Sequence, residues 1–366
     1  MEEGDVNMLY VYYENLNQDS YIGVKKKIIA QCRSFRKAFG NIYYTIYAGQ
    51  TIYLMQDGKV MEKEYAITRQ MRNDAILNWL IKYDIKRVYI RYLLSDLWFV
   101  EFLKELKTME LKRIIEFPTI PYDGEGGITR PEEDRYYREQ LYPYIDCCTT
   151  YSNCETVFHI PCIPLVNGVD IVEHKRKKYR KQDGRIVLLA VASMSKWHGY
   201  ERVIQGMRQY YLNGGKKNIL FNIAGNGGQI QYYKKLVSEY RLQEHVVFRG
   251  QLSGKKLDEL YDNSDIAVGS LGFYKAGLQS GAPIKLREYC ARGIPFIYAY
   301  QDISFHEGND YAYRIPNDET PVDIEKIIDF YEMMYDGRDF IEEMRQYTVE
   351  NLTWDSILQP VIDYLS

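Results

Sequence analysis

A repeated alternation of strand and helix patterns constrains the fold of this 366-residue chain more than any other feature. In the second half, an apolar strand pattern over 186–192 precedes an amphipathic helix pattern over 200–211, and further strand and helix patterns alternate after it. The first half shows the same alternation less regularly. Strands joined by helices in this order form parallel sheets with helices on both faces, so the sequence predicts an α/β protein with two doubly wound units.

The expected elements fall into two arrays. In the first, strands are expected at 8–13, 42–47, 51–55, 87–92, 113–116 and 156–159, and helices at 24–39, 69–83, 97–107 and 133–141. In the second, further strands are expected at 219–224, 246–249, 266–270 and 296–300, and helices at 229–240, 257–263, 323–334 and 340–349, before a last amphipathic stretch at 354–365. A Pro/Gly-rich loop at 118–131 interrupts the first array. Residues 173–183, with six Lys or Arg among eleven, predict a solvated linker or an exposed helix.

Composition excludes several classes of protein. The length suits two domains, and a net charge of −3 gives no electrostatic case for binding nucleic acid. Six scattered cysteines without a Cys-x-x-Cys pair favour reduced thiols over disulfides or structural zinc. The N-terminus lacks a secretory signal and no apolar run reaches membrane-spanning length, so we expect a cytoplasmic protein, soluble or at a membrane surface.

The segment from Ser280 to Pro295 carries the sharpest chemical signal. Pro283 suits the first position of a short helix, and Gly293 suits the residue after its end. Lys285 and Glu288 then share one face near the helix N-terminus, where free N–H groups attract anions. A nucleoside diphosphate would fit these features, and an ordinary surface ion pair is the alternative.

Two loops at the carboxyl ends of expected strands could also meet a ligand. Gly225 and Gly227 form a turn that lets backbone approach a ligand, but Ile230 replaces the third glycine of the dinucleotide fingerprint, so a merely tight turn is equally consistent. Lys196 and His198 follow the strand at 186–192 and would stabilise a leaving diphosphate. The alternative is a loop with an exposed lysine and a packed Trp-His pair.

The first expected helix begins close to Gly23, which would let a sugar or phosphate approach the backbone. This helix carries six cations, Lys25, Lys26, Lys27, Arg33, Arg36 and Lys37. Contact with an anionic membrane surface is conceivable, and a solvated face is the simpler interpretation.

Taken in order, these segments resemble the glycosyltransferases of family 4. The resemblance is carried by Pro164 to Asp170, Trp197 to Tyr200, Val247 to Gly250, Leu260 to Asp265 and the helix that contains Glu288. It implies the GT-B fold, with two facing Rossmann-like doubly wound domains and an interdomain cleft. The implied domains are an acceptor-binding domain at 1–168, to which a helix at 352–366 returns, and a nucleotide-sugar donor-binding domain at 169–351.

The resemblance also implies roles for particular residues. Glu288 would hold the donor ribose, and backbone amides around Gly281 to Lys285 would hold the sugar or the diphosphate. The residues expected at the donor are Gly23, Val24, Gly225, Gly227, Gly281, Ala282, Pro283, Ile284 and Leu286, and those expected to act in catalysis are Lys196, His198, Lys285 and Glu288. Three positions depart from the family pattern: Ser280 stands where an acidic residue binds the sugar, His198 stands where a lysine is usual, and Glu116 lies near the place of an N-terminal histidine.

The function implied is a retaining glycosyltransferase. It would move a hexose or related sugar from a nucleoside diphosphate sugar to a hydroxyl of a glycan or lipid-linked acceptor, in cell-surface polysaccharide synthesis at the inner face of the membrane. We expect no metal cofactor, because no convincing Asp-x-Asp motif is present and Asp262 and Asp265 suit a helix end. The alternatives are a catalytically inactive GT-B partner protein and a nucleotide-sugar epimerase or phosphorylase on the same fold.

Overall fold

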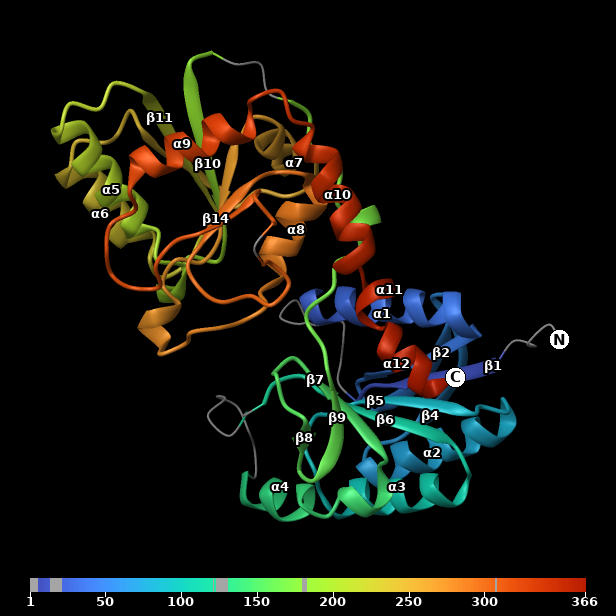
Figure 1. Cartoon of the computed structure of the whole chain (residues 1–366). Helices are drawn as coiled ribbons and strands as arrows, with labels where there is room; N and C mark the ends of the chain where they lie inside the picture. The colour runs from blue at the N-terminus through green and yellow to red at the C-terminus, as the bar shows by residue number, and fades with distance from the viewer. Residues whose placement is uncertain (1–5, 14–21, 121, 123–130, 180–182, 307) are drawn as a thin grey trace. The chain divides into compact units, whose positions relative to one another are not determined.

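The computed structural model describes residues 6–13, 22–120, 122, 131–179, 183–306 and 308–366. The chain divides into two compact domains, each built around one β-sheet (Figure 1). The first comprises Met1–Asn167 together with Trp354–Ser366, and the second comprises Gly168–Thr353.

The sheet of the first domain has nine strands in the order β4-β3-β2-β1-β5-β6-β7-β9-β8. Strands β2, β1, β5, β6, β7 and β9 pair in parallel, whereas β3 and β4 extend one edge and β8 the other by antiparallel pairing. The strands are β1 (Val6–Val11), β2 (Gly40–Ala48), β3 (Thr51–Gln56), β4 (Lys59–Tyr65), β5 (Arg87–Arg91), β6 (Lys112–Phe117), β7 (Cys147–Thr150), β8 (Thr156–Val157) and β9 (Ile160–Pro164).

Helices cover both faces of this sheet (Figure 1). They are α1 (Ile22–Phe39), α2 (Arg69–Lys82), α3 (Leu97–Thr108), α4 (Pro131–Arg138), α11 (Trp354–Ile357) and α12 (Gln359–Leu365). Phe35 of α1 and Trp354 of α11 share one apolar cluster with Tyr89 of β5. On the other face, Trp79 of α2 and Leu103 of α3 belong to a second cluster. The C-terminal helices therefore complete the core of the first domain.

Two features of the first domain differ from the sequence prediction. Strand β4 was not predicted, although Asp57 and Gly58, with φ of 51° and 76°, form the tight turn that Asp-Gly commonly makes between hairpin strands. Strands β7 and β9 were also missed, because the short buried run Cys147–Thr150 has no alternating pattern. The helix expected at 133–141 instead spans Pro131–Arg138. Most of the loop expected at 118–131 lies outside the described residues.

The second domain contains a six-stranded, wholly parallel sheet in the order β12-β11-β10-β13-β14-β15. This is the order 3-2-1-4-5-6 of a doubly wound nucleotide-binding sheet; the doubly wound unit was predicted, but its sixth strand, β15, was not. The strands are β10 (Arg185–Val191), β11 (Asn218–Ala224), β12 (Val246–Gly250), β13 (Ile266–Val268), β14 (Phe296–Tyr298) and β15 (Ala312–Arg314). The helices are α5 (Glu201–Leu212), α6 (Ile230–Glu239), α7 (Gly254–Asp262), α8 (Ile284–Arg292), α9 (Ile324–Met334) and α10 (Phe340–Asn351), with short 3₁₀ turns η3 (Ile171–Glu173), η4 (Lys196–His198) and η5 (Phe273–Ala276).

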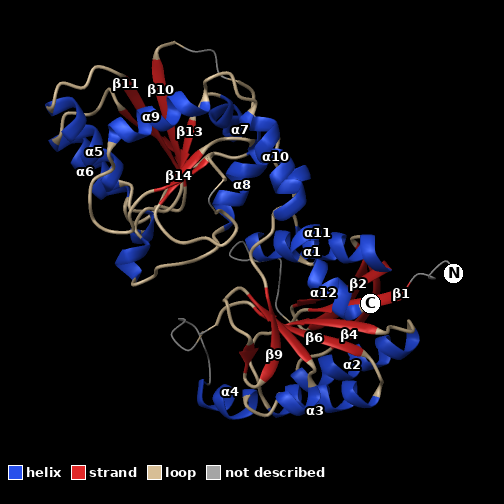
Figure 2. Cartoon of the chain, in the orientation of Figure 1, coloured by secondary structure: helices blue, strands red, loops and turns tan. Residues whose placement is uncertain are grey.

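The strand order reverses at β10, whose two neighbours are β11 and β13, near the middle of the sheet (Figure 2). In such sheets ligands bind beyond the carboxyl ends of the strands at this point. The loops that follow β10 and β13 are joined there by backbone hydrogen bonds, from Leu271 N to His198 O at 2.9 Å and from Gly272 N to Trp197 O at 3.1 Å.

Most described residues of the charged segment at 173–183 are exposed, as expected of a solvated linker, but the segment also bonds to the second domain. Lys177 N donates to Arg292 O at 2.8 Å, and Lys178 N donates to Asp262 Oδ1 at 2.9 Å. These bonds hold an extended segment against the second domain, where Lys177 is 3% exposed. Lys177 therefore departs from the solvation predicted for this segment.

No helix among the described residues is long and apolar enough to span a membrane. Two of the cations on α1 are paired within the first domain, Arg36 with Asp57 and Lys37 with Asp355.

Candidate functional site

Glycines bring three loops of the second domain into backbone contact. Gly199 has φ of 62°, and a Cβ there would lie 2.7 Å from Gly272 N. Gly225 has φ of 126°, and a Cβ there would lie 1.9 Å from Ala192 O. A side chain at Gly227 would similarly meet the backbone of Met194. The glycines expected to approach a ligand thus let the loops after β10, β11 and β13 pack against one another, and Gly225 and Gly227 place the loop that carries His198.

Helix α8 starts beside these loops. It begins at Ile284, with Pro283 as its N-cap at φ −60° and ψ 140°, so Pro283 precedes the first helical residue rather than occupying it. Gly293, with φ of 76°, ends the helix as predicted. Pro283 has no side chain that could cap the first turn, whose free N–H groups carry the positive end of the helix dipole.

Lys285 and His198 meet at this helix start. The distance from Lys285 Nζ to His198 Nε2 is 2.7 Å, across 87 residues of sequence. His198 is only 3% exposed, and burial together with the charge of Lys285 lowers the pKa of His198 to about 3. The imidazole is therefore neutral at neutral pH.

Burial also lowers the pKa of Lys285, to about 8, although the carboxylate of Glu288 opposes the shift. Glu288 lies three residues after Lys285 on α8 and is partly buried. The helix thus presents a lysine close to its titration point and a carboxylate on one face, as the spacing predicted.

The main chain of Ser195 fixes the other ring nitrogen of His198. Ser195 N donates to His198 Nδ1 at 2.9 Å, while Ser195 O lies 3.3 Å from the same atom. When Nδ1 accepts, a neutral imidazole carries its proton on Nε2 and donates it to an uncharged Lys285 amine. When Lys285 is charged, Nε2 must accept, and Nδ1–H turns to Ser195 O. The protonation of Lys285 and the tautomer of His198 are therefore linked.

Two residues expected at the donor have other tasks. Gly281 N donates to Gln301 O at 3.0 Å, and a Cβ at Gly281 would lie 2.8 Å from Phe273 Cε2, so this amide is engaged within the domain and not offered to a ligand. The Leu286 side chain is fully buried in the core of the second domain, so a contact of this residue with a donor would come from its main chain in the first turn of α8. The sequence did not reveal these long-range packing partners.

The remaining second-domain candidates lie at the surface or at its edge. Lys196 is exposed in η4 and forms no ion pair among the residues that the structure describes. Ala282 and Pro283 are partly buried, and Ile284 is 43% exposed.

In the first domain, Glu116 is wholly buried in a polar network. Its carboxylate pairs with Arg91 and accepts hydrogen bonds from Tyr89 Oη at 2.7 Å and Gln31 Nε2 at 3.0 Å, and Lys27 Nζ lies 3.8 Å away. Although burial opposes it, these partners hold the pKa of Glu116 below its usual value. All these contacts lie within the domain, which gives Glu116 a structural task.

The two other first-domain candidates lie in the first turn of α1. Gly23 is exposed, and a Cβ there would meet no described atom of its own domain within 4 Å. Val24 is half-buried against the cluster that α1 shares with α11.

Two residues that support the site were not singled out in the sequence. Ser195 orients His198 as described, and the Ser195-to-His198 spacing of a capping box was the available signal. Arg287, fully buried, pairs with Asp302 and donates to Pro283 O at 3.3 Å, which anchors the start of α8. Nothing in the sequence indicated that Arg287, a charged residue between Lys285 and Glu288, is buried.

Comparisons with known proteins identify the fold class of this chain. The model of glycosyl transferases group 1 matches residues 171–302, the greater part of the second domain. Solved glycosyltransferases superpose over nearly the whole chain, so both domains together have the GT-B fold of these enzymes.

Among the similar structures is a glycosyltransferase from Rickettsia africae ESF-5, at 13% identity and a TM-score of 0.65, covering 99% of this chain and 98% of that one. Another is Anabaena Alr3699/HepE in complex with UDP, at 11% identity and a TM-score of 0.63, covering 98% and 99%. A third is the lipopolysaccharide outer core galactosyltransferase WaaB in its apo form, at 11% identity and a TM-score of 0.61, again covering 98% and 99%. No curated protein sequence matched.

Proposed function

We propose that this protein is a retaining glycosyltransferase of family 4 that transfers a hexose or related sugar from a nucleoside diphosphate sugar to a hydroxyl group. The observation that carries the proposal is the meeting of Lys285 with neutral His198 at the start of α8, with Glu288 on the same helix face. It lies within the region that the group 1 model matches.

Breaking the bond between sugar and diphosphate builds negative charge on the departing phosphate oxygens. Lys285 and the N-terminus of α8 would stabilise that charge, and exposed Lys196 would reach the outer phosphate. His198 would hold Lys285 in place, and Glu288 would accept hydrogen bonds from the ribose hydroxyls. Because these groups supply the required positive charge, we expect the reaction to proceed without a metal ion.

The donor and the acceptor can be proposed by chemical class. UDP-sugars are the first donors to test, because HepE was solved with UDP and with UDP-glucose. The first domain would bind the acceptor, a glycan or lipid-linked glycan of cell-surface polysaccharide synthesis. We place the reaction at the cytoplasmic face of the membrane, where exposed Lys26 and Arg33 of α1 would meet anionic lipid.

The direct test is incubation of the purified protein with a panel of UDP-, GDP-, ADP- and dTDP-sugars, with acceptor extracts, measuring released nucleoside diphosphate. We expect release with at least one donor, unchanged by EDTA, and a product whose anomeric configuration, read by NMR, matches the donor. Release abolished by EDTA would refute the metal-free mechanism. An inverted anomer would refute retention, and neither release nor binding of any donor would refute the transferase.

Glu288→Gln tests the site itself. The substitution removes the charge but keeps the shape, so we expect kcat/KM for the donor to fall by about tenfold or more, the loss of one charge-assisted hydrogen bond. Glu244→Gln, at an exposed position of the same domain, is the matched control. Equal turnover in both variants would show that Glu288 does not bind the donor.

A further inference from the structure

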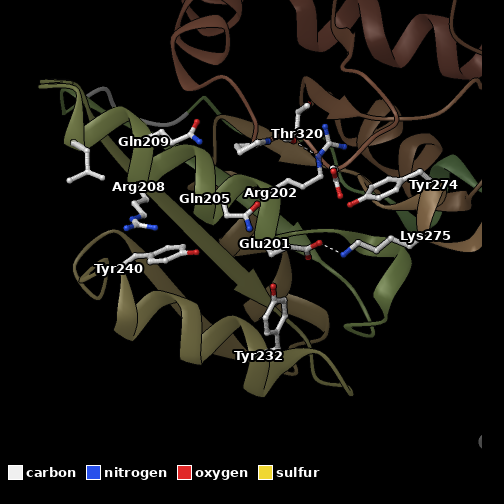
Figure 3. A pocket seen from close by; sticks show the side chains of 13 residues that line it. Glu201, Arg202, Gln205, Arg208, Gln209, Tyr232, Tyr240, Tyr274, Lys275 and Thr320 are labelled. Carbon is white, nitrogen blue, oxygen red and sulfur yellow. Dashed lines mark hydrogen bonds and ion pairs between the residues drawn. The ribbon is translucent and has the colours of Figure 1, made fainter.

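A second cavity lies in the second domain, away from the residues assigned to the donor. It has a volume of about 730 Å³ and is bounded by α5, α6, η5 and residues 319–321 (Figure 3). None of the residues proposed to bind the donor lines it. The volume falls within the range of about 300–1,000 Å³ typical of ligand sites.

The wall of this cavity is fixed by tight packing. Arg202, 1% exposed, donates to Thr320 O at 2.7 Å and to Leu271 O at 2.6 Å. Gly206 of α5 packs closely against Val322, which follows the wall residues 319–321, so a Cβ at Gly206 would lie 2.0 Å from Val322 O. The cavity is therefore preformed rather than opened by movement of a loop.

Aromatic rings and planar polar groups make up most of the lining. Tyr232 of α6 is 43% exposed at the cavity, and the Arg208 guanidinium lies 4.4 Å from the centre of the Tyr240 ring. Figure 3 shows the side chain of Gln205 on α5, next to Glu201. An exposed tyrosine ring offers a flat apolar face with a polar edge.

Glu201 is engaged within the protein, so other polar side chains must meet a ligand in this cavity. Glu201 is 5% exposed, pairs through Oε1 with Lys275 and lies beside the buried hydroxyl of Tyr233, whose pKa is raised by burial and by Glu201. Gln205 lines the cavity one turn further along α5, and its amide can both donate to and accept from a hydroxyl group.

The charges of the cavity are largely balanced. Lys275 is neutralised by Glu201, and the Arg202 guanidinium is occupied by main-chain oxygens. The site therefore lacks the cluster of free cations that a phosphate or sulfate ligand would need. Its mostly polar lining does not suit a lipid chain either.

We propose that this cavity is a second carbohydrate-binding site, which holds a neutral oligosaccharide by stacking a sugar ring on Tyr232 and by hydrogen bonds between sugar hydroxyls and the Gln205 amide. The apolar C–H face and hydroxyl edge of a sugar match a tyrosine ring flanked by planar polar side chains. The site would retain a glycan chain on the enzyme independently of the donor. This inference does not depend on the reaction proposed above.

The test is binding of the full-length protein to an array of neutral, acidic and amino oligosaccharides, followed by calorimetry with the strongest neutral ligand. We expect Tyr232→Ala to weaken binding by about tenfold or more through loss of ring stacking, and Gln205→Ala to weaken it less. Tyr136→Ala, which removes a 67% exposed tyrosine from α4, is the matched control and should bind as the wild type does. Nucleoside diphosphate binding should be equal in all of these variants, which separates this test from that of the donor site.

Three results would overturn the proposal. In the first, the wild type binds no neutral glycan. In the second, Tyr232→Ala binds neutral glycans as well as the wild type does. In the third, the wild type binds only acidic glycans, and salt abolishes that binding. The last result would show that Arg208 and Lys275 form an anion site instead.

Discussion

The affinity of this protein for a nucleoside diphosphate should fall as pH rises through the pKa of Lys285. In the unliganded domain that pKa is about 8, because the side chain is buried beside His198. The ammonium form binds the diphosphate, so above pH 8 binding must first return a proton to the amine. Each pH unit above the pKa then weakens the free energy of binding by about 1.4 kcal/mol.

The magnitude follows from the fraction of Lys285 that is protonated. With a pKa of about 8, that fraction falls from about nine-tenths at pH 7 to about one-tenth at pH 9. The dissociation constant should therefore rise about tenfold over this interval, or about 1.4 kcal/mol. His198 does not contribute, since its pKa of about 3 keeps it neutral throughout.

Isothermal titration calorimetry with whichever of UDP, GDP or ADP binds best measures this change. Lys285→Arg is the control, because arginine stays charged to well above pH 9 while every other ionisation of protein and nucleotide is kept. Between pH 7 and pH 9, we expect the dissociation constant of the wild type to rise about tenfold more than that of the variant. We also expect binding at pH 9 to take up about one proton in the wild type alone. Equal slopes in the two proteins would refute the assignment of Lys285 to the diphosphate.

Three further predictions concern the framework. Asp302→Ala leaves the fully buried Arg287 guanidinium without its carboxylate partner and should destabilise the second domain by about 3–5 kcal/mol, which calorimetry should show as a fall in Tm of about 10 °C. The double variant Asp302→Ala, Arg287→Met should recover most of the lost stability. No recovery would refute the ion-pair explanation. Gly225→Ala should lower stability by about 1–3 kcal/mol or more in denaturant titrations, since φ is 126° and the new Cβ would strike a main-chain oxygen; a neutral effect would refute the close approach. Glu116→Gln should lower Tm at pH 7, and because the folded pKa of Glu116 is depressed, the difference from wild type should shrink as pH falls below about 4; a constant difference would show that charge plays no part.

The sequence predicted five of the six described strands of the second-domain sheet, the end of α8, and its start to within one residue, because these features follow from local patterns. Apolar runs set the strands, and Pro283 and Gly293 bracket the helix through their own backbone preferences. Strand β4 was also predictable, since its Asp57-Gly58 turn is a local signal in the sequence.

Partners that are distant in sequence set the rest. The engagement of the Gly281 amide depends on Gln301, which a spacing rule cannot identify. The neutrality of His198 depends on its burial beside Lys285, 87 residues away. The second carbohydrate site joins residues of four separate segments, so no single segment carried its signal.

The neutral state of His198 bears on why this position carries a histidine where the family resemblance led us to expect a lysine. Two permanent cations about 4 Å apart in a partly buried site would repel by about 4 kcal/mol before any donor arrived. A neutral imidazole held by Ser195 positions Lys285 without that repulsion. With a pKa of about 8, Lys285 is about nine-tenths protonated at pH 7, so the empty site carries one positive charge rather than two. The imidazole then accepts from the ammonium through Nε2 and keeps its own proton on Nδ1, and a bound diphosphate would hold Lys285 fully in this charged form.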